Sequence, residues 1–210
     1  MEIIPHQAEE FVTKERQILD FWFGTRDSDM DIIKEKSALW WGKDNTADQE
    51  IKSLFSDDLE RVIDGEFNHW TETPTGRLAL IILTDQFSRN IYRGTTRAFA
   101  QDALALKWCL EGLEYAVDTR LRPVHRVFFY LPLEHSESLD HQIRSIECFT
   151  ALIDSISPEH KKAFSGFLDF AVKHREIIER FGRFPHRNSI LGRKSTAEET
   201  EFLKQPGSSF

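Results

Sequence analysis

The segment SPEHKKAFSGFLDFAVKHREIIERFG, residues 157–182, decides the fold class of this chain. Its opening Ser-Pro is typical of the N-cap and first position of a helix, and its closing glycine is typical of the residue that follows a last helical turn. Between these signals, apolar side chains and one histidine recur at the spacing of a single helix face. The residues of this face are Phe167, Phe170, His174, Ile177 and Phe181. The segment is therefore predicted to be one long helix with His174 in its buried stripe.

The rest of the chain shows the same helical spacing of apolar residues. It predicts further helices over residues 11–23, 32–41, 46–63, 74–93, 96–113 and 139–153, and a short one after residue 195. The apolar segment 124–131, between Pro123 and Pro132, is ambiguous between strand and helix, and its helical surroundings favour helix. The sequence has no clear alternating strand pattern and no clean repeat of fixed period. We therefore predict one all-α domain over residues 1–210, with seven to nine helices that pack as antiparallel neighbours.

Caps and buried stripes are predicted for several of these helices. Gly24 is expected to end the first helix, and Thr46 opens a capping box for the helix that ends near residue 63. Thr95 or Thr96 is expected to cap the helix over 96–113, and Ser136 the one over 139–153. The predicted buried stripes are Phe99, Ala103, Leu106, Leu110 and Leu113 in the first of these two helices, and Leu139, Ile143, Ile146, Thr150 and Ile153 in the second.

The composition is that of a globular protein and argues against a nucleic-acid partner. Of the 210 residues, 40% are hydrophobic and 30% charged, and 17 Phe and 5 Trp supply large apolar side chains for a thick core. The net charge is −8, and the isoelectric point is near 5.5. A nucleic-acid binder needs a basic face to displace counterions from phosphates, which this balance does not favour.

The same inspection predicts a cytoplasmic protein without a membrane partner. Residues 1–10 carry acids and no apolar core of a signal peptide, and the longest apolar run, residues 78–83, is far too short to span a bilayer. Cys109 and Cys148 lie far apart and are read as reduced core thiols, with one long-range disulfide left as the alternative.

The segment RFGRFPHRN, residues 180–188, has the highest density of polar, chemistry-bearing side chains. It contributes Arg180, Arg183, His186, Arg187 and Asn188 to a stretch, 180–197, that holds five Lys or Arg and no acid. Within an acidic chain, such a stretch forms a local positive field that faces either an anionic ligand or an acidic part of the same molecule. These five residues are candidate site residues.

A second polar group closes the helix predicted over 74–93. Asp85 and Arg89 are four residues apart and share the face of apolar neighbours, so the pair is expected to be at least partly buried. One reading is a buried ion pair that fixes the helix against its neighbours. The other is an arginine that Asp85 orients toward a carboxylate or phosphate, with Asn90 and Arg93 beside it.

The third polar group is LEHSE, residues 133–137, which is read as a turn after Pro132. His135 beside Glu137 fits a general base, a proton shuttle or a metal ligand. Neither HExxH nor a pair of ExxH motifs is present, so no metal and no cofactor is predicted. The chain also lacks a GxSxG nucleophile motif and a glycine-rich phosphate loop.

Four ordered motifs make the chain similar to a known family. They are ILDFWFG at 18–24, DQFSRNIYR at 85–93, HSE at 135–137 and GRFPHRN at 182–188, and together they resemble the uncharacterised family called domain of unknown function 924. The resemblance implies an all-helical fold like that of the tetratricopeptide-repeat superfamily and supplies no activity. The family pattern usually has proline where Ser88 stands, so a local difference near Asp85 is expected. The motifs include the residues singled out above by their chemistry.

The leading hypothesis is a protein that binds a small anionic molecule, and whether it is an enzyme is left open. Arg89, Arg183 and Arg187 would hold the anion. His135, His174 or His186 would transfer protons. One alternative is a helical scaffold whose concave surface binds a peptide or protein partner. A third reading is purely structural, with the polar residues forming a satisfied network that fixes the helices.

Overall fold

A computed structural model of the chain describes the backbone of residues 5–209 and the side chains of residues 14–209. The prediction for residues 1–10 concerns side chains outside this range. The α-helices are α1 (Pro5–Phe23), α2 (Asp29–Trp41), α3 (Asn45–Ile63), α4 (Pro74–Ile81), α5 (Ser88–Ile91), α6 (Asp102–Glu114), α7 (Pro123–Glu134), α8 (Leu139–Ser155), α9 (Pro158–Phe181) and α10 (Ala197–Phe202). Shorter helical turns are η1 (Asn68–Glu72), η2 (Ile82–Phe87), η3 (Thr96–Phe99), η4 (Asp118–Arg120) and η5 (Pro185–Arg187).

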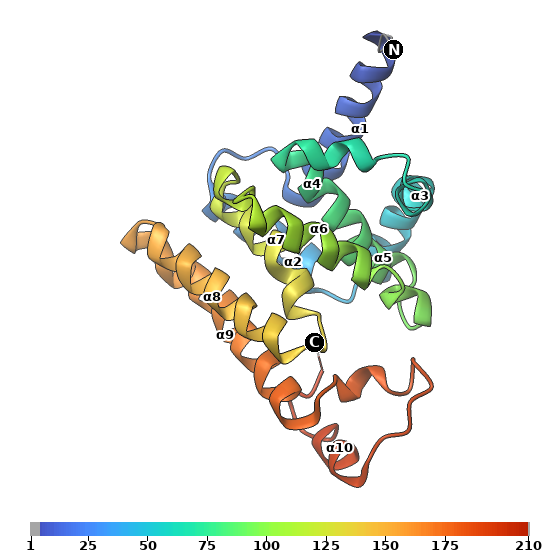
Figure 1. Ribbon diagram of the computed structural model, residues 1–210, viewed down its shortest axis with the longest axis vertical. Coiled ribbons are helices and arrows are strands. Elements are labelled where there is room, and N and C mark those ends of the chain that lie inside the picture. Colours follow the sequence, from blue (N-terminus) through green and yellow to red (C-terminus); the bar gives the residue numbers. More distant parts are fainter. Residues whose placement is uncertain (1–4, 210) are drawn as a thin grey trace.

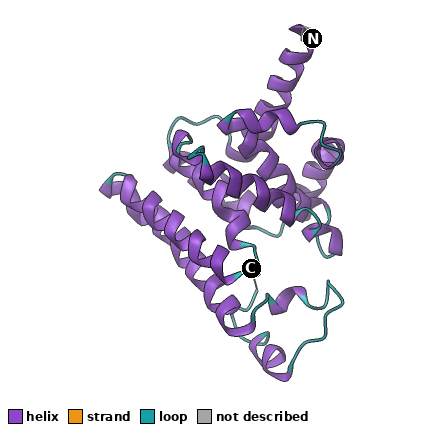
Figure 2. Ribbon diagram, in the orientation of Figure 1, coloured by secondary structure: helices purple, strands orange, loops and turns teal. Residues whose placement is uncertain are grey.

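The described residues confirm the all-α prediction. They contain no strand, and Figure 2 shows helices joined by loops throughout. Because η2 joins α4 and α5 into one continuous helix, these ten segments make nine helices over residues 5–209, within the predicted seven to nine. Over the same range, no helix combines the length and the apolar character needed to cross a bilayer.

The helices pack as neighbouring pairs, in the manner of tetratricopeptide-repeat-like folds. Helices α4 and α7 lie in the middle, with α1 and α6 against α4, and α2, α6 and α8 against α7. Figure 1 shows α8 and α9 as a long antiparallel hairpin along one side of the molecule. The segment after α9, with η5 and α10, extends from the far end of that hairpin.

The main core is a set of interlocking aromatic side chains. Phe87 packs edge-on to Trp22, with ring centroids 5.5 Å apart, and lies 4.7 Å from Phe55. Phe128 of α7 lies 4.7 Å from Trp40. Such aromatic pairs stabilise a fold by roughly 0.5–1.5 kcal/mol each beyond the area they bury. A smaller apolar cluster forms separately at the end of α9, where Ile177, Ile178 and Phe184 pack with Phe181 and Phe202.

Several predicted boundaries are confirmed. Gly24 and Gly182 follow α1 and α9 with φ of +72° and +67°, a backbone conformation that glycine adopts without a side-chain clash. The Ser157-Pro158 start of α9 is also confirmed. Thr196 forms a capping box with Glu199 at the start of α10. The ambiguous segment 124–131 is helical and belongs to α7.

Four other local predictions are wrong. Asp44, and not Thr46, caps α3, because its Oδ1 accepts a hydrogen bond from the Thr46 amide at 2.8 Å. Thr96 opens only the short turn η3, and α6 begins six residues later at Asp102. Helix α7 continues through Pro132 to Glu134, so Pro132 does not end the segment. The N-cap of α8 is Ser138, and Ser136 Oγ accepts from its amide at 3.3 Å.

The buried faces of α6 and α8 also differ from the predicted stripes. Helix α8 buries Gln142, Ser145, Cys148, Phe149 and Leu152, and leaves Leu139 and Ile143 exposed. The cause is Gln142, whose Nε2 lies within 3.3 Å of three carbonyl oxygens at the end of α7, those of residues 133, 134 and 136. These carbonyls have no partner within α7, so α8 turns a polar side chain inward to bind them.

In α6 the difference follows from close packing against α7. Helix α6 buries Ala105, Trp108, Cys109 and Gly112 in place of the predicted leucines. A Cβ on Gly112 would lie 2.5 Å from the Phe129 ring, so only glycine allows α6 to approach α7 this closely. In α9 His174 is buried as predicted, whereas Phe170 is half exposed. Both cysteines are buried and reduced, which confirms the thiol reading.

Candidate functional site

The site begins at η2, where α4 widens into a π-helical turn over Ile82–Phe87. The Ser88 amide reaches the carbonyl of Leu83, five residues back. Two carbonyl oxygens around this turn accept hydrogen bonds from side-chain hydroxyls: Thr84 Oγ1 donates to Leu80 at 2.7 Å, and Ser88 Oγ donates to Thr84 at 2.8 Å. The helix passes from η2 into α5 at Ser88 without a break. Single π-helical turns inside α-helices recur at functional sites, and this one carries Asp85.

Asp85 is fully buried and surrounded by donors. Its Oδ1 lies 2.7 Å from His135 Nδ1 and 3.3 Å from Arg89 Nη1, and its Oδ2 accepts from Gln86 Nε2 at 2.5 Å. Burial alone would raise the pKa of this carboxyl, but the charge of Arg89 and the contact with His135 outweigh it and lower the pKa below its ordinary value. Asp85 is therefore an ionised carboxylate in the interior.

His135 follows the last residue of α7 and has its tautomer fixed by Asp85. An ionised carboxylate can only accept, so Nδ1 must carry the proton that is shared with Asp85. Burial, opposed by Asp85 and assisted by Arg89, lowers the pKa of His135 below its ordinary value. The imidazole is then neutral, with its lone pair on Nε2. Its side chain is 16% exposed, against 1% for Asp85, so the dyad reaches the surface through the histidine.

Asp102, the first residue of α6, links two arginines. Arg89 donates to both of its carboxylate oxygens, at 2.8 and 3.2 Å. Arg187 Nη1 lies 3.5 Å from Asp102 Oδ2, which is longer than a hydrogen bond. We refer to Asp85, Arg89, Asp102, His135 and Arg187 together as the Asp102 cluster.

Arg187 is the least paired member of the Asp102 cluster. Its guanidinium lies over the rings of Phe184 and Phe99, at 4.5 and 4.9 Å from their centroids, and its side chain is only 8% exposed. Its buried Nε has no hydrogen-bond partner among the described residues. Burial, together with the charge of Arg89, lowers the pKa of Arg187 to about 10. At neutral pH it therefore remains a cation with incomplete pairing.

Glu134 and His174 form a second titratable pair beside the Asp102 cluster. His174 Nδ1 lies 3.1 Å from Glu134 Oε1 and 2.8 Å from the Phe170 carbonyl oxygen, and the His174 ring centroid is 6.3 Å from that of His135. Burial raises the pKa of Glu134 to about 8 and lowers that of His174 to about 3. At neutral pH the pair is therefore a carboxylic acid beside a neutral imidazole.

His186 lies at the edge of the Asp102 cluster and is partly buried. Burial and the charge of Arg187 lower its pKa to about 4, and the charge of Arg89 acts in the same direction. Its ring centroid is 5.6 Å from that of Phe184. The structure thus brings together six of the predicted site residues: Asp85, Arg89, His135, His174, His186 and Arg187.

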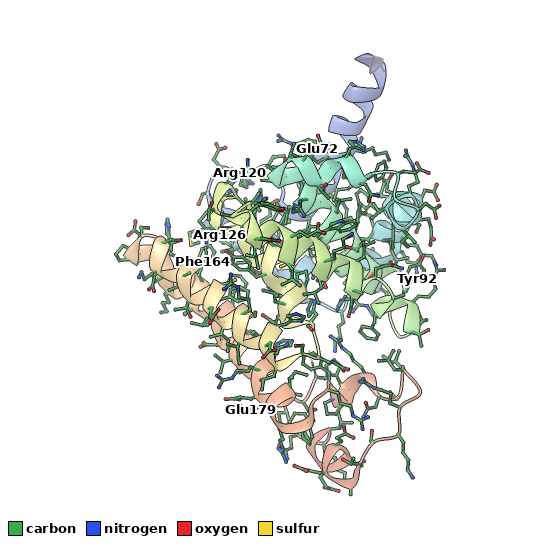
Figure 3. The ribbon with its side chains drawn as sticks, in the orientation of Figure 1. Glu72, Tyr92, Arg120, Arg126, Phe164 and Glu179 are labelled. Carbon is green, nitrogen blue, oxygen red and sulfur yellow. The ribbon has the colours of Figure 1, made fainter. Side chains whose placement is uncertain are left out.

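Two predicted site residues belong to a surface contact with α3. Asn90 Nδ2 donates to Asp48 at 2.8 Å, and Arg93 binds the same carboxylate through two nitrogens, at 2.5 and 2.8 Å. Figure 3 labels the neighbouring Tyr92 at the outer edge of the molecule. Asn90 and Arg93 therefore attach α5 to α3.

Four more predicted site residues are engaged in contacts around the start of α10. Arg183 binds Glu199 through two nitrogens at 2.6 and 2.8 Å, and Asn188 Nδ2 donates to Glu199 at 3.3 Å. Arg180 pairs with Glu198 at the surface. Glu137 accepts two hydrogen bonds from Arg193, at 2.6 and 2.9 Å, and one from the Phe184 amide. These contacts hold η5 and α10 against α9.

Sequence reasoning missed Asp102, Glu134 and Gln142. Asp102 was hidden because the helix start was assigned to Thr95 or Thr96, although an acid in a first helical turn is a usual signal. Glu134 escapes notice because it follows Pro132, and a proline usually marks the end of a helix. No simple signal reveals Gln142, since its role depends on the carbonyls of another helix. Among the described residues, no group of three or more His, Cys, Asp or Glu is placed to hold a metal ion.

Comparisons with known proteins agree with the motifs. The family model described as a bacterial protein of unknown function, DUF924, matches residues 18–207. The solved structure of a protein of unknown function from Agrobacterium tumefaciens is 34% identical, with a TM-score of 0.79, over 93% of this chain and 99% of that one. No curated protein gives a significant match. Because the family model spans nearly the whole sequence, this chain belongs to the bacterial family called domain of unknown function 924.

Proposed function

We propose that this protein binds a small anionic molecule at the Asp102 cluster and exchanges a proton with it through His135. The observation that carries the proposal is Arg187, a guanidinium more than nine-tenths buried whose Nε has no partner among the described residues. A buried donor left without a partner costs about 1–3 kcal/mol, more when it is charged. An anion that accepts a hydrogen bond from this donor recovers that free energy. Arg187 is therefore well suited to bind an anion.

The surroundings of Arg187 favour binding of an anion at one edge of its guanidinium group. Phe99 and Phe184 cover the faces of the guanidinium, and Asp102 lies beside Nη1. The opposite edge, with Nε, presents parallel N–H donors in the geometry that carboxylate and phosphate oxygens fit. Because the two rings fix the plane of the group, little side-chain entropy is lost when a ligand binds.

His135 supports a role in proton transfer. Its Nδ1 is committed to Asp85, so the neutral ring presents a basic Nε2, and the side chain is partly exposed. A histidine oriented by a buried carboxylate in this way is a competent general base. Two of the residues predicted from the sequence fit these roles less well. Arg183 is already bound by Glu199, and His174 is almost completely buried. If the bound molecule is also transformed, the reaction begins with transfer of a proton between that molecule and His135.

A thermal-shift screen with small carboxylates and inorganic phosphate tests the binding proposal. A ligand that binds only the folded state at 100 times its Kd stabilises it by about 2.7 kcal/mol. We expect at least one anion to raise the melting temperature of the wild type and to have no effect on Arg187→Met. Arg93→Met is the matched control, since Arg93 is 39% exposed and binds Asp48 outside the Asp102 cluster, so its loss should leave the response intact. A screen without any shift, or an unchanged response in Arg187→Met, contradicts the proposal.

A second candidate function is docking of a protein or peptide partner. Three large apolar side chains are at least 40% exposed on the α8–α9 hairpin: Leu139, Ile143 and Phe170. Leu139 and Ile143 are four residues apart and so share one face of α8. Under this proposal, Leu139→Asp combined with Ile143→Asp abolishes the complex with the partner on size exclusion and leaves any anion response unchanged.

A further inference from the structure

The formal charges of the Asp102 cluster cancel. Arg89 and Arg187 contribute two positive charges, and Asp85 and Asp102 contribute two negative charges. An incoming anion adds one negative charge to a region where Asp85 is 1% and Arg187 8% exposed. An uncompensated charge in such a buried setting is strongly unfavourable. The site must therefore gain one positive charge when the anion binds.

We propose that the site takes a monocarboxylate together with one proton, with the carboxylate on the Nε edge of Arg187 and the proton on Nε2 of His135. This inference rests on the function proposed above and specifies its ligand class. The proton comes from solvent, and no covalent bond of the protein or the ligand is broken. The product is an imidazolium that donates from Nδ1 to Asp85, so the added positive charge lies next to a carboxylate that already faces it.

The unpaired Nε edge of Arg187 matches a carboxylate better than a phosphate. One guanidinium edge offers two parallel N–H groups, which pair with the two oxygens of a planar carboxylate. A phosphate would add further oxygens and, near neutral pH, up to a second negative charge close to Asp102 and Asp85. Those two carboxylates would repel it, because Arg89 is already shared between them. Electrostatic complementarity therefore selects a single negative charge.

His135 is the residue placed to take the proton. The groups that face it are Asp85 of η2, Arg89 of α5, His174 of α9, and His186 and Arg187 of η5. Asp85 favours the imidazolium, and the two arginines oppose it in the free protein. A carboxylate bound on Arg187 neutralises one of the opposing charges and so shifts the balance toward protonation. The adjacent Glu134 already carries its proton, and His174 is more deeply buried than His135.

Isothermal titration calorimetry of the wild type measures the proton directly. Acetate, butyrate and inorganic phosphate are titrated at pH 7.5 in buffers with different ionisation enthalpies. We expect the carboxylates to bind with uptake of about one proton and to lose affinity as pH rises, about tenfold per unit between the free and bound pKa values of His135. We expect phosphate to bind more weakly or not at all.

The variant His135→Asn keeps a donor toward Asp85 and cannot accept a proton. It should bind the carboxylates at least tenfold more weakly at pH 7.5, without proton uptake. Should that variant fold poorly, nitrogen-15 spectra of the wild-type histidines give the same answer, because His135 should change from a neutral ring to an imidazolium when acetate is added.

Each outcome has a definite meaning. Carboxylate binding without proton uptake overturns the present inference and leaves the proposed function standing, and so does a site that prefers phosphate. Absence of any anion binding overturns both. Proton uptake that persists in His135→Asn shows that another group carries the proton and also contradicts the assignment.

Discussion

Arg183 and Arg187 lie four residues apart in one motif, yet the structure treats them in opposite ways. Arg183 is 29% exposed and makes two hydrogen bonds to Glu199 and a third to the Lys194 carbonyl oxygen. Arg187 is 8% exposed and has a single 3.5 Å contact with Asp102. The more deeply buried arginine is the less well paired one, which is the reverse of what stability alone would favour. Within five residues, the chain therefore carries a structural strut, Arg183, and a candidate ligand-binding arginine, Arg187.

The contacts of Arg183 with Glu199 help to position the candidate site. Glu199 gathers Arg183, Asn188 and the Thr196 amide at the start of α10, and Glu137 binds Arg193 and the Phe184 amide. Both groups hold the backbone on either side of η5. Arg187 is therefore fixed in place by its neighbours in the chain, which leaves its own side chain free to be recognised by a ligand.

The largest expected effect comes from Asp85→Asn. The substitution keeps the shape of the side chain but removes the charge that Arg89 and His135 face. Removing one partner of a buried ion pair costs about 3–5 kcal/mol, so the free energy of unfolding in urea should fall by that amount. Asp48→Asn is the control, since its partner Arg93 is 39% exposed and the loss should be clearly smaller. A smaller loss for Asp85→Asn than for Asp48→Asn would remove Asp85 as the anchor of the cluster.

A pH effect of intermediate size is expected from Glu134 and His174. Burial raises the pKa of Glu134 from 4.5 to about 8, so the folded state keeps a proton that the unfolded state loses, and stability falls as pH rises through this range. Burial lowers the pKa of His174 from 6.5 to about 3, so its contribution to stability rises between these values. The two oppose each other between pH 4.5 and 6.5. From pH 6.5 to 8 only Glu134 acts, and stability should fall by about 2 kcal/mol.

Glu134→Gln isolates this contribution. Glutamine keeps the size and the hydrogen-bonding capacity of the neutral acid but cannot titrate. Urea unfolding at pH 6.5 and pH 8 should show the decline in the wild type and its absence in the variant. An equal decline in both proteins would mean that Glu134 is already ionised at pH 6.5.

The smallest effect on stability is expected from Arg187→Met, which tests directly whether Arg183 and Arg187 differ in their structural role. Asp102 keeps two hydrogen bonds from Arg89, so no carboxylate is left without a partner. Replacing a poorly paired buried charge by an apolar side chain of similar length should change stability by less than about 1 kcal/mol in either direction. Arg183→Met, by contrast, deprives Glu199 of two hydrogen bonds and should lower the melting temperature. The opposite ranking would make Arg187 the strut.

The sequence predicts the helical fold well because its signals are local. The Ser157-Pro158 start, the Gly182 end and the spacing between them depend only on neighbours along the chain. The buried faces of α6 and α8 were predicted less well, because they depend on contacts between helices. Gln142 turns inward to bind the end of α7, and Gly112 allows α6 to approach Phe129. Neither contact can be recognised from the spacing of apolar residues in the sequence.

The candidate site was predicted only in part, because it too depends on contacts between distant parts of the chain. Residue chemistry selected Asp85, Arg89, His135 and Arg187 as candidates, and the fold brings their side chains close together. It could not separate Arg183 from Arg187, since both have the same side chain and only the position of Glu199 distinguishes them. Whether Arg187 and His135 bind a ligand stays a prediction.

The π-helical turn η2 makes chain length, rather than side-chain identity, the sensitive quantity in this part of the molecule. Because its hydrogen bonds span five residues rather than four, the turn holds one residue more than an α-helix would over the same length. Deleting one residue from Ile82–Phe87 would therefore let the segment close as a regular α-helix, with little rotation of Phe87 and Arg89 relative to α4. Adding one residue has no such outlet, and at about 100° per residue it would turn Phe87 away from Trp22 and Arg89 away from Asp102, although every side chain of the core and of the polar cluster would still be present.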